Sequence, residues 1–482
     1  MTAKTYLNYI NGEWACSSTE KTFNMLNPAN QDLVGCAQKS SESDMQKAID
    51  AASRAFENTT WKKNSSLRAK VLLEWASILE EKIEDLAYLY TINNGKRIAE
   101  ARGELKGSID SIRYNAGLAR NVFGRTIEPA ENSYSYIMRE PLGVVGIISP
   151  WNWPAQLMLR EMVPALAAGN TVVFKPASLT AAISMEIIKA LSEVKDLPKG
   201  VVNAVSGSGK VLGEYMADSK QVGMISFTGS TGVGKRISEL SSKTLKKVTL
   251  ELGGKSPNVV FEDANLDNVI PAVLNAVFLT SGQVCMAGTR LVVQDTVFDE
   301  VVEKVKTETE KLKVGNGLEK DTDLGPLVSE EQLKIVMEYI ELGKKEGKLI
   351  TGGNRLKGKE YDKGFFVAPT VFADLDNNSR LIQEEIFGPV LVIQKFHTEK
   401  EAIDIANGTK YGLAGAIWTN DLNRALRVAN KVEAGTVWLN TYYKLYNQAE
   451  FGGYKESGVG RVRGIDGLNE FTQTKNICID VK

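Results

Sequence analysis

Hydrophobic residues in the N-terminal quarter of the chain recur mostly every three or four positions, the spacing of amphipathic helices. Ser43 and Ser65 stand where N-caps of the first two such segments are expected. Before them, residues 5–14 read as two short strands turning at Asn11 and Gly12, which predicts a β-hairpin. The helices are expected at residues 44–58, 67–92 and 99–122.

From residue 143 the pattern changes to short, unbroken apolar runs separated by helical segments. Such runs are typical of strands buried on both faces, and their alternation with helices predicts a doubly wound parallel sheet. Strands are expected at 143–149, 170–175, 201–205 and 222–227, and helices at 155–168, 182–194 and 209–218.

The same alternation continues to residue 440 and predicts a second α/β domain. Between the first helices and the first buried strand, residues 133–136 alternate as a strand does. The later strands are expected at 248–252, 257–261, 290–293, 366–371, 389–394, 413–418 and 435–440, and the helices at 297–311, 330–345, 398–406 and 422–432.

Composition narrows the classes of function. The net charge of the 482 residues is −1, with no long run of one sign, which argues against a nucleic-acid or membrane-surface partner. Four scattered cysteines and one histidine make a disulfide framework and a metal site improbable. No signal peptide and no stretch of ~18 apolar residues is found, so we expect a soluble cytoplasmic protein.

Cys285 is the candidate nucleophile, because small residues surround it and it follows an apolar run. A single histidine, His397, leaves it without an obvious imidazole base. Glu251 lies in another apolar run, where an acidic residue is costly unless it is paired or functional. Asn152 follows a buried strand, where crevice loops lie. The alternatives are a structural cysteine, a salt bridge from Glu251 to a lysine, and a turn-forming asparagine.

Two glycine-rich stretches are near matches to nucleotide-binding motifs. Residues 207–213 would fit GxGxxG if the third glycine came one place earlier. Residues 229–236 would fit a P-loop, but Arg236 occupies the place of the Mg²⁺-binding Ser or Thr. Either could be a simple turn between strand and helix, although free backbone N–H groups at the second could bind a diphosphate.

Seven ordered stretches together carry a resemblance that none of them carries alone. They are Pro150–Pro154 (PWNWP), 174–177 (FKPA), 227–231 (FTGST), 251–257 (ELGGKSP), 282–285 (GQVC), 384–390 (EEIFGPV) and 451–458 (FGGYKESG). On these motifs the chain resembles the NAD(P)-dependent aldehyde dehydrogenase superfamily nearly from end to end. The resemblance implies an α/β fold with a Rossmann-like doubly wound cofactor domain, a second α/β catalytic domain and a small β oligomerisation arm.

The resemblance also implies the domain limits and the assembly. The cofactor domain would comprise residues 1–123 and 140–251, and the catalytic domain residues 252–448. Residues 124–139 and 449–482 would form the oligomerisation segments of a homodimer or homotetramer.

The resemblance assigns Cys285 as the thiolate that attacks the aldehyde carbonyl, with Asn152 and the Cys285 N–H holding the oxyanion. Hydride transfer to NAD would leave a thioester, and Glu251 would activate the water that hydrolyses it. A carboxylate would thus replace histidine as the base. The implied cofactor-binding residues are Trp151, Lys175, Ser178, Gly229, Ser230, Gly234, Glu385 and Phe387.

Two departures from the family pattern suggest further expectations. Ser178 replaces a glutamate of NAD-preferring members, so we expect NAD to be used and NADP to be less excluded. Val462 replaces a family glutamate while Glu161 replaces a family lysine, and we hypothesise that Glu161 supplies the missing carboxylate near a proton path to the general base.

The implied substrate pocket is largely aromatic and apolar. Arg160 matches an arginine of succinic semialdehyde and lactaldehyde dehydrogenases, so it could bind a substrate carboxylate or pair with a protein carboxylate. A betaine-aldehyde-like cation is a further alternative, since Trp153, Tyr442 and Tyr443 could offer ring faces. The expected pocket residues are Trp153, Arg160, Val284, Met286, Tyr443 and Phe451.

The sequence leaves three other functions open. In an acylating or phosphorylating relative, CoA or phosphate would resolve the thioester, and Glu251 argues against it. A non-catalytic protein on the same fold would have no need to keep Cys285, Glu251 and Asn152 together. A P-loop ATPase is weakened by Arg236.

Overall fold

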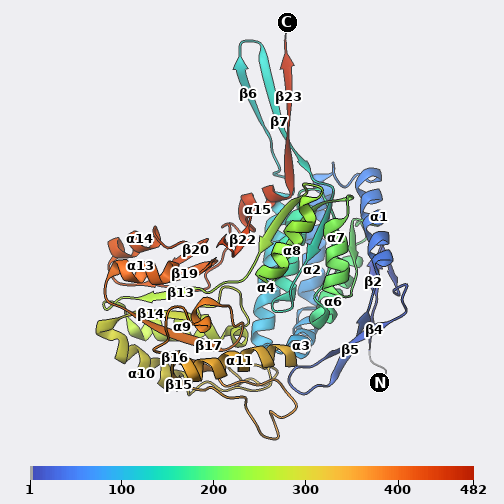
Figure 1. Cartoon of the computed structure of the whole chain (residues 1–482). Helices are drawn as coiled ribbons and strands as arrows, with labels where there is room; N and C mark the ends of the chain where they lie inside the picture. Colours follow the sequence, from blue (N-terminus) through green and yellow to red (C-terminus); the bar gives the residue numbers. More distant parts are fainter. Residues whose placement is uncertain (1–3, 482) are drawn as a thin grey trace.

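The computed structural model describes residues 4–481. Two α/β lobes lie side by side, and a narrow three-stranded arm projects from their junction (Figure 1). The first lobe is built mainly from the N-terminal half of the chain and the second from the later residues. Within the described residues, no helix is both long and apolar enough to cross a membrane.

The first lobe is built on an eight-stranded sheet, in the order β22-β12-β11-β8-β9-β10-β2-β3. Its five central strands run parallel, as the unbroken apolar runs predict, and all but three of their residues are buried. The hairpin at Asn11 and Gly12 is confirmed and closes one edge of the sheet. The strands are β2 (Asn8–Ile10), β3 (Glu13–Ala15), β8 (Val144–Ile148), β9 (Thr171–Lys175), β10 (Val202–Ala204), β11 (Val222–Thr228), β12 (Lys247–Glu251) and β22 (Gly458–Val459).

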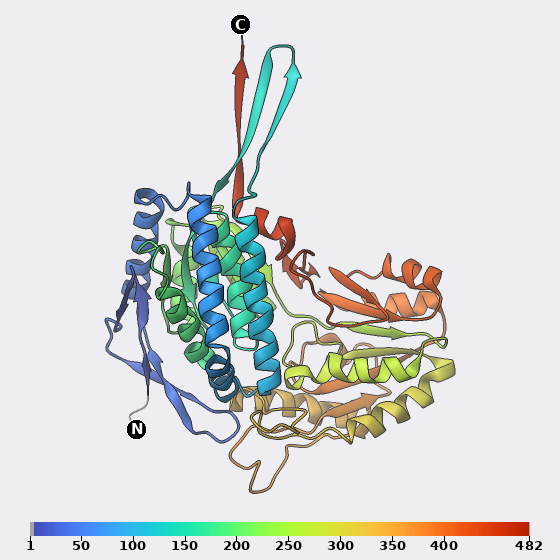
Figure 2. The same cartoon turned by 180° about the vertical axis from the view of Figure 1, so that it is seen from behind.

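Helices cover both faces of this sheet, and the long N-terminal ones pack together on the side seen in Figure 2. Helix α5 is almost wholly buried beneath them. The helices are α1 (Glu42–Asn58), α2 (Ser65–Glu81), α3 (Ile83–Asn94), α4 (Ile98–Leu118), α5 (Pro154–Ala167), α6 (Ala181–Ser192), α7 (Glu214–Asp218) and α8 (Thr231–Ser242), with a π-helical turn at Gly209–Gly213 before α7.

The two predicted N-caps are wrong by one or two positions. Helix α1 is capped by Ser41, not Ser43, because the Asp44 carboxylate accepts the Ser41 N–H at 3.0 Å. Helix α2 is capped by Asn64, whose side chain accepts the Leu67 N–H, and Ser65 is its first residue. In both segments several neighbouring residues can cap, so composition alone does not select one.

The single helix predicted over residues 67–92 is two helices. The backbone leaves helical geometry at Lys82 (φ −96°, ψ 7°), so α2 ends at Glu81 and α3 begins at Ile83. This change of direction lets α3 pack against α4 and α6. The apolar spacing continues across the break, and therefore the sequence pattern does not reveal it.

The second lobe contains a seven-stranded sheet, in the order β15-β16-β17-β14-β13-β19-β20. All neighbouring strands are parallel except the β15–β16 pair. The elements are β13 (Pro257–Val260), β14 (Arg290–Gln294), β15 (Lys348–Thr351), β16 (Thr370–Ala373), β17 (Val390–Phe396), β19 (Ala414–Trp418) and β20 (Thr436–Leu439), with α9 (Leu266–Phe278), α10 (Phe298–Thr309), α11 (Glu330–Glu346), α12 (Arg380–Gln383), α13 (Glu399–Asn407) and α14 (Leu422–Ala429).

The strand predicted over residues 366–371 is displaced, since β16 covers Thr370–Ala373. Pro369 precedes it and has no N–H to donate to a ladder, so the apolar residues before it remain outside the strand. Phe366 and Val367 are buried in the core all the same. Burial, rather than strand pairing, accounts for their hydrophobicity.

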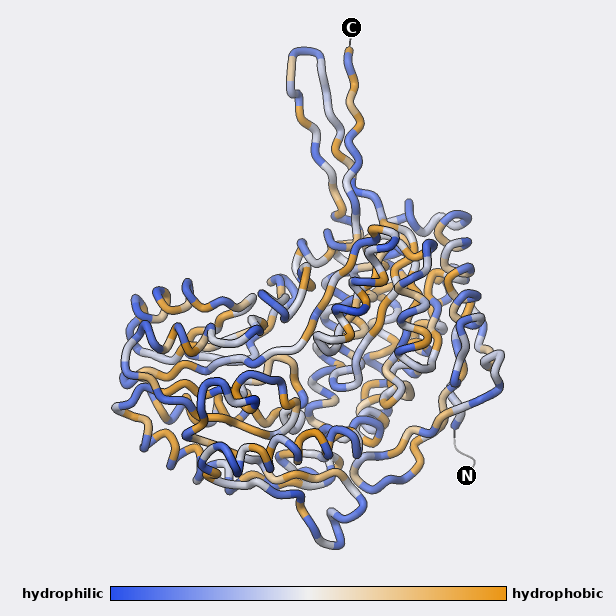
Figure 3. The backbone as a smooth tube through the Cα atoms, in the orientation of Figure 1, coloured by the Kyte–Doolittle hydropathy of each residue, from blue (hydrophilic) through white to orange (hydrophobic). Residues whose placement is uncertain are grey.

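The arm consists of β6 (Arg125–Ala130), β7 (Ser133–Pro141) and β23 (Thr472–Asp480), in the order β23-β7-β6. The antiparallel register runs from Thr472 opposite Pro141 to Asp480 opposite Ser133. Polar and apolar positions alternate along it in Figure 3. The strand pattern at residues 133–136 is confirmed and extends further, and β23 joins the C-terminal segment to it.

A few short strands and one short helix remain. A three-stranded sheet, in the order β1-β5-β4, lies at the N-terminal side of the first lobe. The elements are β1 (Thr5–Tyr6), β4 (Thr22–Leu26), β5 (Leu33–Gln38), β18 (Tyr411–Gly412), β21 (Tyr454–Lys455) and α15 (Gly464–Glu470).

Candidate active site

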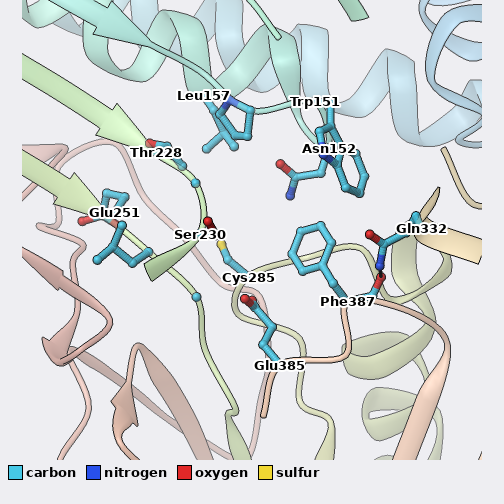
Figure 4. A pocket seen from close by; sticks show the side chains of 14 residues that line it. Trp151, Asn152, Leu157, Thr228, Ser230, Glu251, Cys285, Gln332, Glu385 and Phe387 are labelled. Atoms are coloured by element: carbon cyan, nitrogen blue, oxygen red, sulfur yellow. Dashed lines mark hydrogen bonds between the residues drawn. The ribbon is translucent and has the colours of Figure 1, made fainter. Parts of the chain in front are cut away.

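A cavity of about 230 Å³ lies where the carboxyl ends of β8, β11 and β12 face the second lobe. This is the edge of a parallel sheet at which ligands bind in doubly wound folds. Figure 4 shows Cys285 near its centre. The lining residues are Pro150, Trp151, Asn152, Leu157, Thr228, Gly229, Ser230, Glu251, Leu252, Gly253, Cys285, Gln332, Glu385 and Phe387.

The loop that presents Cys285 has an unusual backbone. After α9 ends, Thr280 and Ser281 have φ values of 50° and 55°, followed by Gly282 at 74°. A Cβ on Gly282 would lie 2.1 Å from the Gly388 carbonyl oxygen, so only glycine fits there. The turn brings Cys285 to the cavity from the second lobe, opposite the strand ends of the first.

The Cys285 side chain is a thiol in the resting site. Burial raises its pKa to about 12, although the Arg160 charge opposes the shift. A thiolate is the nucleophilic form, so this site needs a base to activate the sulfur. The only histidine, His397, contacts the Asp295 carboxylate instead.

Asn152 faces the cavity from the loop between β8 and α5 (Figure 4). Its side-chain N–H₂ donates to the Gln283 carbonyl at 2.9 Å, which ties it to the cysteine loop. The Asn94 side chain, at the end of α3, donates to the Trp151 carbonyl at 2.8 Å and so helps to fix the same loop. The amide is therefore held beside Cys285, where it can donate to an oxygen bound there.

Glu251 is the last residue of β12 and lies directly across the ladder from Thr228. Burial raises its pKa to about 8, with Arg160 opposing the shift. One carboxylate oxygen, Oε1, has no hydrogen-bond partner among the described residues. In Figure 4 Glu251 and Cys285 border the same cavity without pointing toward one another. The alternative of a lysine salt bridge is wrong, since the cation near Glu251 is Arg160, at 4.0 Å.

The opposite side of the cavity is suited to a ribose and a planar ring. Burial raises the pKa of Glu385 to about 7, and the Gly254 N–H donates to its Oε1 at 3.2 Å. A Cβ on Gly253 would lie 2.2 Å from Glu385 Oε2, so the missing side chain makes room for this carboxyl. Trp151 and Phe387 pack edge to face with centroids 5.3 Å apart.

The N-terminus of α8 opens onto the same cavity. Gly229 and Ser230 line it, and the Ser230 side chain makes no capping hydrogen bond to the helix. The first N–H groups of the helix are thus available to an anion, and the helix dipole favours one there. Gly234 lies in the first turns of α8 and packs on Leu252. A Cβ on Gly234 would lie 2.5 Å from a methyl carbon of Leu252. Its absence of a side chain lets helix and strand approach closely.

Lys175 is the last residue of β9 and Ser178 follows that strand, and neither is among the residues that line this cavity. Lys175 is buried, and burial lowers its pKa to about 8. Its Nζ lies 3.3 Å from the position of a Cβ on Gly209, within the first glycine-rich stretch. Ser178 donates to the Gly207 carbonyl at 3.0 Å. The donors and spaces from Lys175 through α8 to Glu385 fit a dinucleotide in chemistry and in order.

The predicted substrate-pocket residues are not among those that line the cavity. Met286 and Phe451 pack with Cys285 in a small apolar cluster, and Val284 is buried. Tyr443 packs edge to face on Tyr442 and donates to the Ala276 carbonyl at 2.7 Å.

Arg160 and Trp153 require a correction, because protein groups already engage them. Arg160 is buried, and it donates to Glu161 at 2.9 Å and to Thr228 at 3.0 Å. The Lys96 ammonium lies 4.4 Å from the centroid of the Trp153 ring. The alternative in which Arg160 pairs with a protein carboxylate is confirmed, and the substrate-carboxylate alternative loses most of its support.

Thr228, Gln332 and Gly253 line the cavity and were not singled out from the sequence. Thr228 and Gly253 stand inside motifs that carried the resemblance, which is the signal that could have found them. Gln332 lies on α11, and its side chain donates to the Phe387 carbonyl at 2.9 Å. Nothing in the local sequence of α11 indicates that contact.

Comparison with known proteins places this geometry in context. The Aldehyde dehydrogenase family model matches residues 14–477. The betaine aldehyde dehydrogenase of Bacillus subtilis (strain 168) is 42% identical over 477 residues, covering 98% of this chain and 97% of its own length. An aldehyde dehydrogenase of Davidiella tassiana is 42% identical over 474 residues, covering 98% and 94%. The solved structure of a Staphylococcus aureus betaine aldehyde dehydrogenase in complex with NAD⁺ matches with a TM-score of 0.97 and 37% identity, covering 98% of this chain and 94% of that one.

Proposed function

The chain belongs to the aldehyde dehydrogenase family, and we propose how its own residues carry out the family's reaction. It is an NAD(P)-dependent enzyme that oxidises an aldehyde to the carboxylic acid. When bound, the nicotinamide supplies the hydride acceptor. The observation that carries the assignment of roles is that Cys285, Asn152 and Glu251 border one cavity.

In this assignment the Cys285 sulfur adds to the aldehyde carbon while its proton passes to Glu251, directly or through water. The oxygen gains negative charge and accepts hydrogen bonds from the Asn152 amide and the Cys285 N–H. Loss of the hydride leaves a thioester. Glu251 passes the cysteine proton to solvent and then takes a proton from water, whose oxygen attacks the acyl carbon. The carbon–sulfur bond breaks, the acid leaves, and the Cys285 sulfur takes the proton back from Glu251.

NADH formation from propanal, with and without CoA, tests this function. We expect turnover without CoA in the unaltered protein and none in Cys285→Ala. A product that forms only with CoA would instead favour an acylating enzyme. Asn152→Ala should lower kcat by roughly 10²–10³-fold, the usual cost of one oxyanion donor. An Asn152→Ala variant with unaltered kcat would refute the oxyanion role.

We propose one set of residues for each part of the dinucleotide, from the adenosine end to the nicotinamide end. Lys175 would contact the adenosine ribose, Gly229 and Ser230 the diphosphate, and Glu385 the nicotinamide ribose, with Phe387 beside the ring. Ser178 carries no charge to repel a 2′-phosphate, so we propose that NAD is preferred and NADP accepted. Ser178→Glu should abolish NADP turnover while NAD turnover persists. Complete absence of NADP turnover in the unaltered protein would overturn this proposal.

For the substrate, we propose an uncharged aldehyde. Neither Trp153 nor Arg160 lines the cavity, since the Trp153 ring faces Lys96 and Arg160 pairs with Glu161. Relatives named betaine aldehyde dehydrogenase make that cationic aldehyde the second candidate. Rates of NADH formation with propanal, benzaldehyde, succinic semialdehyde and betaine aldehyde separate them, and a higher kcat/KM for betaine aldehyde would reverse the order.

Assembly, domain limits and location complete the proposal. We propose cofactor-binding residues 1–123 and 140–251, a catalytic domain at 252–448, and oligomerisation through residues 124–139 and 449–482. The projecting arm, with exposed Ile127 and Ile477, supports a homodimer or homotetramer. We also propose a cytoplasmic location. Light scattering on the purified full-length chain distinguishes monomer, dimer and tetramer.

A further inference from the structure

A buried group of charges lies next to Glu251. Arg160 and Glu161, neighbours on α5, form its centre, and both side chains are almost fully buried. The Arg160 Nε donates to Glu161 at 2.9 Å, and its Nη2 donates to the Thr228 hydroxyl at 3.0 Å. Its third nitrogen, Nη1, lies 4.0 Å from Glu251 Oε2 and makes no hydrogen bond among the described residues.

The sheet holds this arginine from two positions of β11 that are two residues apart. Glu161 accepts the Ser226 hydroxyl at 2.6 Å, and Ser226 in turn accepts from Thr249 at 2.9 Å. Ser226 pairs with Thr249 in the β11–β12 ladder, and Thr228 pairs with Glu251 two residues later. The guanidinium is therefore fixed against β11, next to the strand that carries Glu251. Among the described residues, Nη1 is its one nitrogen without a hydrogen bond.

We propose that Arg160 is a positioning residue for Glu251, which holds the carboxyl group to one side of Cys285 and favours its ionised form, and that Glu161 tunes the strength of this hold. The inference rests on the proposed role of Glu251 as the base that activates water. A hydrophobic side chain would fill the position without the desolvation cost of a buried arginine, and replacing buried ion pairs in this way is often neutral. The charge therefore calls for a role beyond packing.

Other charges also face Glu251, from two further segments. Arg461 and Arg463 follow β22, and both favour the carboxylate; Cys285 lies across the cavity. Arg463 is held by Asn447 at 2.8 Å and Arg461 by the Gly460 carbonyl at 2.7 Å. Neither is as near as Arg160, since no other cation lies within 4.0 Å of Glu251 in the described part of the chain.

Arg160 and Glu161 act on Glu251 in opposite directions. The cation lowers the pKa of Glu251, and the Glu161 anion raises it. Removing Arg160 should therefore leave Glu251 protonated to higher pH, which slows thioester hydrolysis at neutral pH. Removing the Glu161 charge should extend the ionised range to lower pH. A group that only supports the fold would not produce shifts of opposite sign.

Hydrolysis of the acyl-enzyme is the step to measure. The purified oligomer is mixed with NAD and a limiting pulse of propanal, and decay of the acylated Cys285 is followed by intact-protein mass spectrometry across pH. Arg160→Gln should move the midpoint up by about 1 unit or more, with hydrolysis about tenfold slower at neutral pH. Arg160→Lys should recover part of that rate, and Glu161→Gln should move the midpoint down.

The exposed pair Arg427 and Glu399 provides matched controls, because these side chains form an ion pair at 2.7 Å on the surface. Arg427→Gln and Glu399→Gln should leave the midpoint in place. Unchanged midpoints in both α5 variants, or shifts in the same direction, would overturn the proposal. Should Arg160→Gln not fold, an unchanged profile in Glu161→Gln decides against it. Failure of the unaltered protein to form NADH would instead refute the proposed function.

Discussion

Two buried ion networks flank α5, and they differ in whether their hydrogen bonds are complete. One joins Lys96 to Glu104, at 2.5 Å, with both side chains 0% exposed. The other joins Arg160, Glu161 and Glu251 at the end of β12. Both reach α5, the helix that follows the loop carrying Asn152, through Gln156 in the first network and Arg160 in the second.

In the Lys96–Glu104 network both carboxylate oxygens have hydrogen-bond partners, and we call such a network closed. Glu104 also accepts the Tyr90 hydroxyl at 2.5 Å and the Gln156 N–H at 2.9 Å, so both its oxygens are used. The Lys96 ammonium lies 4.5 Å from the Tyr90 ring centroid, which adds a favourable contact. A network of this kind fixes α3, α4 and the start of α5 relative to one another.

The Glu251 network is open, since one carboxylate oxygen has no partner among the described residues and the nearest guanidinium nitrogen is at 4.0 Å. A buried carboxyl left in this condition costs stability. It also keeps one oxygen free to bind water and raises the pKa toward neutral, as a general base requires. The two networks therefore differ in one respect: both carboxylate oxygens of Glu104, in the supporting ion pair, have hydrogen-bond partners, whereas Glu251, in the reactive group, keeps one oxygen without a partner among the described residues.

The largest expected effect is on the open network. Glu251→Gln should slow thioester hydrolysis by roughly 10²–10⁴-fold, because the amide cannot take a proton from water. The first turnover of NADH should slow as well, because Glu251 also takes the Cys285 proton, and the unfolding midpoint should not fall. Stopped-flow absorbance and thermal unfolding measure the two. Loss of folding in this variant would show that the open network supports the structure as much as the closed one does.

The closed network should show the reverse. Glu104→Gln leaves Lys96 without its carboxylate and should destabilise the protein by about 3–5 kcal/mol, as for other broken buried pairs. The double variant Lys96→Met with Glu104→Leu should regain most of that loss, since no charge is left unpaired. Denaturant unfolding measures both. Equal stability of Glu104→Gln and the unaltered protein would contradict the comparison.

The smallest expected effect concerns pH. Burial raises the pKa of Glu251 to about 8, so the base is mostly protonated at pH 7 and becomes active as pH rises. The rate of thioester hydrolysis should increase about tenfold between pH 7 and pH 9 and then level off. Single-turnover rates across this range test it. A rate already level at pH 6 would mean that Glu251 is ionised more easily than its burial predicts.

Much of the fold could be predicted because strong local patterns specify it. The buried strands from Val144 to Glu251 and the hairpin at Asn11 follow from apolar runs and turn chemistry. The break at Lys82 and the displacement of β16 could not, since helix packing and the proline before the strand decide them against a continuous apolar pattern. The predictions of the two N-caps were wrong for a related reason. Neighbouring polar residues can each cap the helix, and small differences in free energy decide between them.

The sequence by itself determined the chemistry of this protein: a cysteine without a histidine, an acidic residue in an apolar run, and an ordered set of motifs that indicates aldehyde oxidation. The tertiary structure alone decided how those groups are used. It brought α5 beside the end of β12, so that Arg160 donates to Glu161 and lies 4.0 Å from Glu251. Such a pairing depends on which buried charges come within a few ångströms, and residues 91 positions apart in the chain carry no local signal of that distance.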